Sequence, residues 1–326
     1  MSFIGAIESG LRRVLRSKRM AVALWLVNLL VALPVAWTMG AILEESIGAS
    51  LVQEKLKDGF DFDWYWKFSD EAGGIATTLT PSVVGAGAFY NNLETWITGD
   101  LFETFPGLVA LGILYALLWA FLMGGVLERL ARPEERASVP GFVQAGGRYF
   151  YRFVRLTIFT AVPYVLIYLA SRWFYDRLDF LTRDVTREWT IFTLSLLTLA
   201  ATSLLLVAVH IASDYAKIAT VVEEKHGMLR ALVGGCRFVL TYPGAVLGIY
   251  YGIALIGVIL LAIYAMLAPG AGQSTIVGVS LAFIAGQVFL FTRLALRLTL
   301  LGSQTAFFQA TPKASSLSLP TTPSAL

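Results

Sequence analysis

Apolar residues are gathered into long uncharged runs along this chain, and the charged residues lie between the runs. Residues 20–43, 104–127 and 189–213 each hold 24 or 25 residues without a charge, and 156–171 holds 16. A further 55 uncharged residues, 238–292, are enough for two more runs. A helix needs about 20 apolar residues to cross a bilayer. The pattern therefore predicts six membrane-spanning helices, because the runs are continuous rather than alternating as in a β-barrel.

Short amphipathic segments precede three of the runs. In residues 1–19, apolar side chains recur at spacings of three and four, and five basic residues crowd the end nearest the first run. Residues 142–153 and the segment that leads to Gly234-Gly235 have a similar character. This pattern is typical of helices that lie in the membrane surface. We expect the first of them to anchor the topology through anionic lipid, or to bind a specific lipid headgroup.

Each amphipathic segment contains a pair of small residues, namely Ser9-Gly10, Gly146-Gly147 and Gly234-Gly235. When the three segments are aligned at these pairs, each shows the same order: a surface helix, a pair of small residues, a few basic or aromatic residues and an apolar run. The alignment predicts a threefold parallel repeat of one surface helix and two spans, in which the small pairs let each surface helix pack closely on a span. The sequence identity between the three segments is slight, so the common pattern is explained equally well by gene duplication and by the same physical constraint on each segment. Secondary transporters more typically contain inverted repeats.

The composition is that of a membrane protein, with 57% hydrophobic and 14% charged residues, where soluble domains have about 25% charged residues. With the N-terminus in the cytoplasm, 18 of the 25 Lys and Arg fall on the cytoplasmic side, and 15 of the 22 acidic residues fall outside. Cytoplasmic loops are normally enriched in basic residues. We therefore predict a single all-α domain over residues 1–310 in the inner membrane, with both termini cytoplasmic. Residues 311–326 are expected to be a disordered tail.

The longest connection, residues 44–103, lies outside the cell in this topology and carries a cluster of aromatic residues. Amphipathic rings favour the headgroup level of a membrane, so we expect an outer interfacial surface. Its candidate residues are Trp64, Tyr65, Trp66 and Phe68. A helix over about 81–96 is expected after Thr80-Pro81, since Thr caps helices and Pro is favoured in their first turn. The loop is interpreted as a cap over the bundle, or as a lid or docking surface for a lipid or protein partner.

Ionisable residues near the inner ends of the predicted spans are the best candidates for a site. They are Glu128, His210, Asp214, Arg293 and Arg297. His210 and Asp214 are four residues apart and share a helix face, as do the two arginines. Because charges at membrane depth usually pair, we expect Asp214 to pair with Arg293 or Arg297, with His210 beside it. The alternative is that these groups reach water at the helix ends.

Catalytic and cofactor motifs are absent from the sequence. It has no Gly-rich phosphate loop, no His-Glu-x-x-His pair and no nucleophile-elbow serine. His210 and His226 are the only histidines and Cys236 is the only cysteine. A zinc or haem site would therefore need unusual ligands, and no disulfide can form within the chain. We expect no enzyme activity, no cofactor, no metal and no nucleic-acid partner.

The exit from the fourth run carries a resemblance to known membrane proteins. The run leaves the membrane as Asp214-Tyr215-Ala-Lys, passes an acidic step and a turn, and continues as Ala-Leu-Val-Gly-Gly-Cys-Arg-Phe before the next run. This resembles the cytoplasmic hairpin of poorly characterised bacterial six-helix families, among them the membrane domain fused to glycerophosphodiester phosphodiesterases. The resemblance covers about residues 189–265 and implies an inner-membrane protein. The phosphodiesterase activity is not carried over, because this sequence lacks the soluble domain.

Two functions are consistent with these features. The first is an accessory or structural membrane protein that binds membrane lipids, another membrane protein or a second copy of itself through its surface helices and outer loop. The second is a permease-like or lipid-handling transporter with a cavity between the repeats, which a cavity lined by His210 and Gln287 would favour. We favour the first, because the middle of the predicted spans contains few polar residues.

Overall fold

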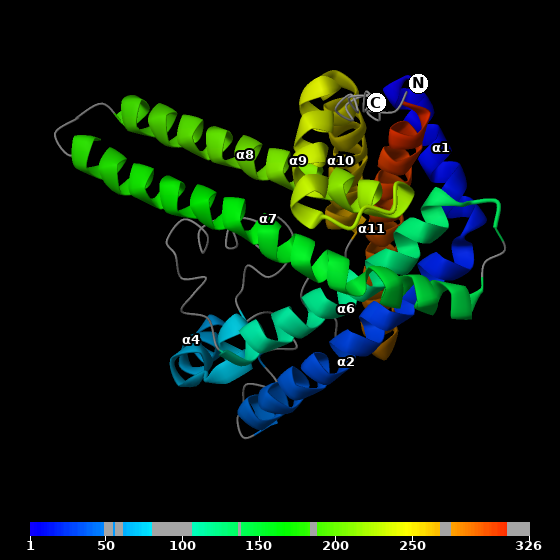
Figure 1. Ribbon diagram of the computed structural model, residues 1–326. Coiled ribbons are helices and arrows are strands. Elements are labelled where there is room, and N and C mark those ends of the chain that lie inside the picture. Colours follow the sequence, from blue (N-terminus) through cyan, green and yellow to red (C-terminus); the bar gives the residue numbers. More distant parts are fainter. Residues whose placement is uncertain are drawn as a thin grey trace, which may run out of the picture.

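The computed structural model describes residues 1–48, 55, 61–79, 106–135, 138–182, 188–267 and 275–311 of the chain. In these ranges every regular element is helical (Figure 1), which confirms the predicted all-α class. The helix expected at residues 81–96, and the tail beyond residue 311, lie outside the described ranges.

Six long helices correspond to the six predicted spans. Each is long and apolar enough to cross a bilayer, so the chain is a multi-pass membrane protein by the length and composition of its helices. They are α2 (Lys18–Gly48), α6 (Pro106–Ala131), α7 (Val139–Thr182), α8 (Glu188–Val222), α10 (Pro243–Leu267) and α11 (Ile276–Ala310). The first span continues beyond residue 43, because Glu44 and Glu45 are good helix formers.

Shorter elements lie beside the spans. They are α1 (Phe3–Arg16), α4 (Phe62–Glu71), the 3-10 turn η1 (Gly74–Thr78) and α9 (Met228–Thr241). Side-chain oxygens satisfy the free N–H groups at several helix starts. Ser2 Oγ accepts a hydrogen bond from Gly5 N at 3.2 Å, and the Asp61 carboxylate accepts bonds from Asp63 N and Trp64 N at 3.0 and 3.2 Å.

The second amphipathic segment differs from the prediction, because it is continuous with the third span. α7 is a single helix of 44 residues with Pro163 inside it. No proline or glycine stands where the surface segment meets the span, and Thr157 Oγ1 bonds back to the Phe153 carbonyl at 2.9 Å. The other two segments do break before their spans. α1 ends at Ser17, and α9 ends at Tyr242, where the missing N–H of Pro243 favours a new helix start.

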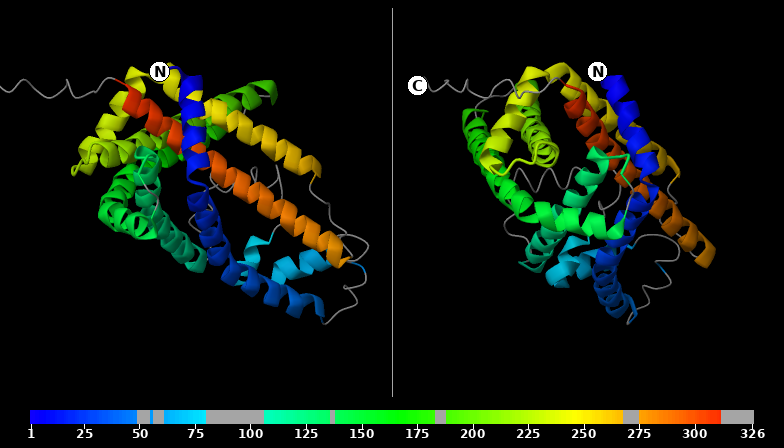
Figure 2. Two further views of the ribbon diagram at one scale, coloured as in Figure 1. Left: turned by 90° about the vertical axis from the view of Figure 1, so that its right-hand side faces the viewer. Right: turned by 45° about the vertical axis from the view of Figure 1, so that its right-hand side comes forward.

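One end of the molecule gathers α1, α9, the first turns of α7 and the last turns of α6, α8 and α11 (Figures 1 and 2). We call it the basal end. Hydrogen bonds there join distant parts of the chain: Arg13 Nη1 donates to the Leu130 carbonyl at 2.7 Å, and Gln309 Nε2 donates to the Ala131 carbonyl at 3.0 Å. The start of α1, the end of α11 and both turns predicted to be cytoplasmic therefore share one end, as six alternating spans require.

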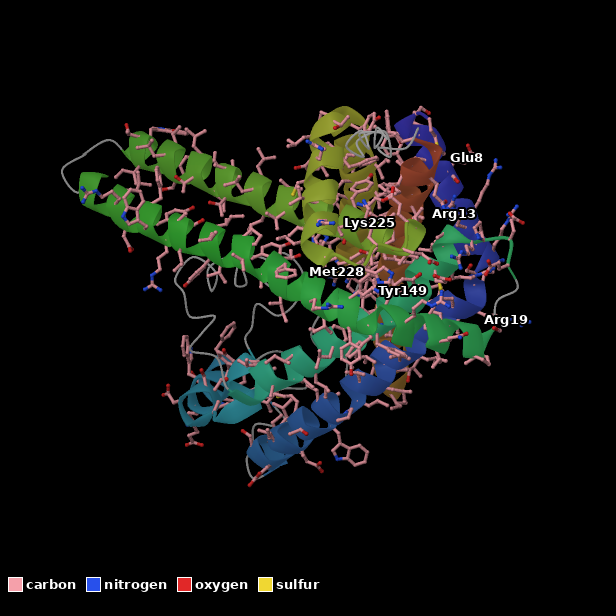
Figure 3. All side chains as sticks on the ribbon, in the orientation of Figure 1. Glu8, Arg13, Arg19, Tyr149, Lys225 and Met228 are labelled. Carbon is pink, nitrogen blue, oxygen red and sulfur yellow. The ribbon has the colours of Figure 1, made fainter. Side chains whose placement is uncertain are left out.

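Most of the fully buried large side chains also lie at the basal end, including Tyr149 of α7 (Figure 3). The others there include Leu127, Leu130, Phe153, Ile211, Tyr215, Ile218 and Leu298. Away from this end the spans separate into arms, and α7 and α8 run side by side as one of them (Figure 1). Many apolar side chains along the arms are exposed, such as Leu197, Leu204 and Leu205 of α8. Lipid tails are as apolar as leucine and would cover these faces.

Polar side chains join the spans along the arms. On the α7–α8 arm, the Ser171 and Thr202 hydroxyls are 3.1 Å apart and both are buried. On the other side of the molecule, Tyr115 of α6 donates to Asn28 Oδ1 of α2 at 2.7 Å. Asn28 of the first span is thus bonded to another span. Such interhelical bonds are typical of membrane bundles, where they add stability in the absence of a hydrophobic driving force.

The aromatic cluster after α2 lies at the end of the molecule opposite α1 (Figure 1), and its role differs from the prediction. Trp64, Tyr65 and Phe68 are buried against the last turns of α2, and Trp64 Nε1 donates to Ser46 Oγ at 3.1 Å. Only Trp66 of the four candidate surface residues is exposed, at 64%. The correction has a simple cause. The cluster folds as a helix, so residues 64, 65 and 68 share one face and residue 66 points away from it.

Candidate functional site

Three glycines bring a short helical segment against a span at the basal end. Gly10 of α1 lies against Thr299 and Ser303 of α11, and a Cβ added to it would come within 2.7 Å of the Thr299 carbonyl oxygen. Gly235 of α9 lies against Ala212 and Ala216 of α8, where a Cβ would approach the Ala216 nitrogen to 3.0 Å. Only glycine permits such an approach of two backbones.

The third glycine contact involves α7 and α6. A Cβ on Gly146 would come within 3.0 Å of the Phe121 carbonyl oxygen, whereas a Cβ on Gly147 would meet nothing within 4 Å. The contacting glycine is therefore the first of its pair here and the second of its pair in α9. The glycines in close contact are therefore Gly10, Gly146 and Gly235, whereas the predicted alignment had placed Gly147 in line with Gly10 and Gly235. Residue spacing alone could not distinguish the two glycines of a pair.

The corrected register places similar residues at similar distances from the contacting glycine. All three segments have an arginine two positions after the contacting glycine: Arg12, Arg148 and Arg237. Five positions after it stands an exposed apolar or aromatic residue: Leu15, Tyr151 and Leu240, with exposures of 53%, 73% and 80%. Seven positions after it stand Ser17 and Tyr242, which end α1 and α9 with nearly the same backbone angles, φ −113° and ψ 34° against φ −125° and ψ 49°.

The last turn of α6 accepts hydrogen bonds from two other helices. Its final carbonyl groups have no partner within the helix, and Arg13 of α1 and Gln309 of α11 supply donors to Leu130 and Ala131. Arg13 Nη1 also donates to Gln309 Oε1 at 2.9 Å, so the two capping side chains hold each other. A cation at a helix C-terminus also interacts favourably with the helix dipole. Burial lowers the pKa of the Arg13 guanidinium from its usual value, but arginine stays charged in proteins.

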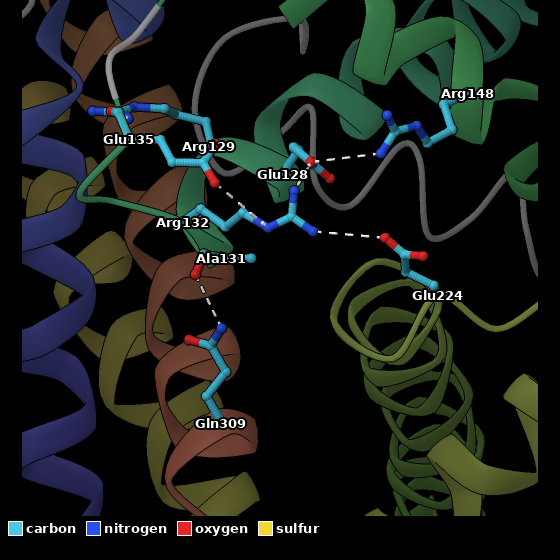
Figure 4. A network of polar contacts seen from close by, with 8 residues as sticks. All are labelled: Glu128, Arg129, Ala131, Arg132, Glu135, Arg148, Glu224 and Gln309. Atoms are coloured by element: carbon cyan, nitrogen blue, oxygen red, sulfur yellow. Dashed lines mark hydrogen bonds and ion pairs between the residues drawn. The ribbon is translucent and has the colours of Figure 1, made fainter. Parts of the chain in front are cut away.

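Glu128 lies in an ion-pair network beside this cap (Figure 4). Its carboxylate pairs with Arg132, the residue after the end of α6, and lies 4.0 Å from Arg148 of α7. Arg132 in turn lies 3.7 Å from Glu224 in the turn between α8 and α9. Because most of these groups are exposed, each pair is worth at most about 1 kcal/mol. The network therefore fixes the relative positions of the turns more than it stabilises the fold.

Asp214 makes different contacts from those predicted. Its side chain is 7% exposed, and it pairs with Lys217 at 3.1 Å and with His210 at 3.5 Å, both on the same helix. Among the described residues no ion pair joins Asp214 to Arg293 or Arg297. The physical reason is local: a lysine three residues away on the same helix face satisfies the carboxylate at a lower entropic cost than a distant arginine does.

The two arginines of α11 are separate from Asp214. The Arg297 guanidinium lies over the Trp119 ring of α6, with Cζ 4.9 Å from the ring centroid. Arg293 is exposed, and within the described part of the chain it has no hydrogen bond, ion pair or ring contact. The structure thus brings His210 and Asp214 together, and places Glu128 and the two arginines in two other surroundings.

Several residues of these sites could not be singled out from the sequence. Arg13 was one of five basic residues in a segment expected to lie at the membrane surface, and nothing distinguished it as a cap of another helix. Gln309 stands in no motif. Lys217 had a signal, because it follows Asp214 by three residues on a predicted helix. Trp119 stands in the middle of an apolar run, where a tryptophan is most simply a packing residue.

Within the described residues, no group of three His, Cys, Asp or Glu side chains is placed to hold a metal ion. Cys236 is exposed on α9. Comparison of the chain with protein-family models, with curated proteins and with solved structures finds no match. The arrangement of residues at the basal end is therefore the basis for the function proposed below.

Proposed function

We propose that this integral membrane protein is of an accessory or structural type, and that it binds anionic lipid headgroups through the helical segments of its basal end. The observation that carries the proposal is the surface of α1. Ala6, Gly10 and Val14 are buried on one side of it, while Ile4, Leu11 and Leu15 are exposed on another side. A helix with a buried face and a second apolar face needs a further apolar medium, and a membrane surface supplies one.

Arginines flank this exposed apolar strip. Arg12 and Arg16 follow Leu11 and Leu15 by one residue each, so they stand at the edge of the strip, where headgroups would lie. α9 has the same combination, with Leu229, Val233 and Leu240 exposed and basic residues beside them. Each basic residue near an anionic surface contributes about 1 kcal/mol to membrane binding. Two segments of this kind support a lipid-binding role better than one would.

The same proposal includes a topology and a repeat. Lys and Arg are concentrated at the basal end, which supports a cytoplasmic location for it in an inner membrane. The three glycine contacts, together with the shared arginine and exposed apolar positions, support a threefold repeat of a surface helix and two spans. The transporter alternative receives less support. Gln287, which would line a cavity in a transporter, accepts a hydrogen bond from Trp25 of α2 at 3.2 Å and so joins two spans.

Cys236 provides the test, because it is the single cysteine and lies exposed on the apolar side of α9. A fluorophore attached to it in proteoliposomes should be quenched by lipids that carry a quencher on the acyl chain, and more strongly when phosphatidylglycerol replaces phosphatidylcholine. The matched control carries the fluorophore on the polar side of α9, in Arg230→Cys with Cys236→Ser, and should be quenched less by the same lipids. Equal quenching at the two positions would contradict a surface helix.

A further inference from the structure

α6 and α11 cross near the basal end (Figures 1 and 2), and two side-chain contacts join them there. Arg297 lies over Trp119, and Gln309 bonds to Ala131, so in both contacts the partners are 178 positions apart. The two contacts are twelve residues, or about 18 Å, apart along each helix. The Trp119 ring stacks on Tyr115, and Arg293 precedes Arg297 by four residues, on the same side of α11. We call these four residues the patch.

This patch contains donors and no anion. Trp119 Nε1 is buried and has no hydrogen-bond partner in the described structure, and the Tyr115 hydroxyl already donates to Asn28. The nearest candidates for a counterion are committed elsewhere. Glu128 pairs with Arg132, and Asp214 pairs with Lys217. Buried donors without a partner are uncommon, and guanidinium groups on a span normally pair.

The depth of the patch fits the level of the lipid headgroups. Arg293 and Arg297 follow the first residue of α11 by 17 and 21 positions, which corresponds to about 26 and 32 Å along the helix axis. The hydrocarbon core of a bilayer is about 30 Å thick. If α11 enters the hydrocarbon near its first turn, the two guanidinium groups lie where the phosphate groups of the basal leaflet lie.

Apolar surface continues from the patch toward the middle of the membrane. Leu290 and Phe283 are exposed, and they precede Arg297 by seven residues and by fourteen, so they lie on the same side of α11. Gly112 of α6 precedes Trp119 by seven residues and has open space where a Cβ would be. An acyl chain could therefore extend along this apolar surface from a phosphate held by the arginines.

We propose that Arg293, Arg297 and the indole N–H of Trp119 form a binding site for a phosphate-bearing anion, supplied by the headgroup of an anionic phospholipid. Guanidinium groups bind phosphate oxygens through two parallel hydrogen bonds, which lysine cannot do. The site deepens the proposed lipid-binding function, but it is separate from the surface strips of α1 and α9. A bound phosphate would supply the negatively charged partner that the two arginines do not have among the described residues.

Native mass spectrometry of the full chain tests this site. The protein is purified in detergent, freed of lipid, and given phosphatidylglycerol, phosphatidylcholine or inorganic phosphate. We expect one phosphatidylglycerol to be retained per chain, and the variant Arg293→Gln with Arg297→Gln to bind it about tenfold more weakly or worse, since two charge-assisted bonds are lost. Retention of inorganic phosphate without phosphatidylglycerol would assign the same site to a soluble phosphate compound.

The control variant, Arg12→Gln with Arg16→Gln, removes the same charge from the strip on α1. It should retain the bound lipid and weaken only the contact of the α1 strip with anionic headgroups. Trp119→Phe keeps the ring under Arg297 and removes one donor, so it should weaken binding several-fold even if the double arginine variant fails to fold. Equal retention by the wild type and by the Arg293 and Arg297 variant would overturn the site. If the Arg293 and Arg297 variant retains phosphatidylglycerol but the Arg12 and Arg16 variant loses its contact with anionic headgroups, the lipid-binding function proposed for α1 remains supported.

Discussion

The contact between α9 and α8 makes a sharp prediction about two adjacent glycines. Gly235 faces the α8 backbone, where a methyl group would overlap the Ala212 carbonyl and come within 3.0 Å of the Ala216 nitrogen. Gly234 faces outward, and a methyl group there would make only an ordinary contact with Lys225 Nζ at 3.6 Å. Both are in the interior of α9, so alanine improves the helix propensity equally at the two positions.

The magnitudes follow from two opposing effects. Alanine in place of glycine stabilises a helix by about 1 kcal/mol, and overpacking a close backbone contact costs about 1–3 kcal/mol. Gly234→Ala should therefore raise the free energy of unfolding slightly. Gly235→Ala should lower it, so that the two variants differ by about 1–3 kcal/mol. Because the two changes are chemically identical and one residue apart, the comparison cancels effects on the unfolded chain and on expression.

The measurement is equilibrium unfolding in mixed micelles, followed by circular dichroism. The pair Gly146→Ala and Gly147→Ala in α7 provides a second comparison, in which the first variant should be less stable than the second. Equal free energies of unfolding for Gly234→Ala and Gly235→Ala would show that α9 does not press on α8 as closely as the structure has it. The close glycine contacts would then give no support to a repeat.

Three further predictions concern the basal end. Arg13→Met leaves the Leu130 carbonyl without its donor and should cost about 1–3 kcal/mol of stability in the same assay, whereas Arg12→Met, on the exposed side of α1, should cost less than about 1 kcal/mol. Lys217→Met leaves the Asp214 carboxylate without its closest cation and should cost about 3 kcal/mol, part of which Asp214→Asn should restore; no restoration would contradict the pair. A membrane-impermeant maleimide should label Cys236 in inverted vesicles and not in intact cells, and labelling in intact cells would refute a cytoplasmic basal end.

The number of spans could be predicted from the sequence because a bilayer imposes one simple requirement, a long uncharged run. Helix boundaries followed a different rule. The chain breaks before α10, where Pro243 removes an N–H, but it continues through α7, where nothing interrupts the backbone hydrogen bonds. An amphipathic pattern beside an apolar run therefore indicates that the amphipathic segment is a helix with one polar and one apolar face. It does not determine whether that helix is separate from the span or continuous with it.

The contacts of the candidate site residues were less predictable, because each depends on which side chains of other helices lie nearby. The five ionisable residues were expected at one depth near the inner ends of the spans, yet Arg293 lies 17 residues from each end of α11. Depth alone also does not select which charges meet. Asp214 bonds within its own helix, and Arg297 of α11 faces α6, because helix rotation determines the direction of a side chain. The aromatic cluster was subject to the same difficulty. Four aromatic residues in a row of five looked alike in the sequence, and only the helix they form separates the three buried rings from Trp66.

The packing of α1 on α11 shows that the basal end is held by matching surfaces and not only by short connections. α9 follows α8 after one turn, so their proximity is nearly unavoidable, whereas α1 and α11 are separated by almost the whole chain. Gly10 nevertheless approaches α11 as closely as Gly235 approaches α8. Without α1, the buried hydroxyl groups of Thr299 and Ser303 would face lipid or water. The first helix therefore completes the basal end, and only the apolar strips and arginines on its outer side remain for other molecules.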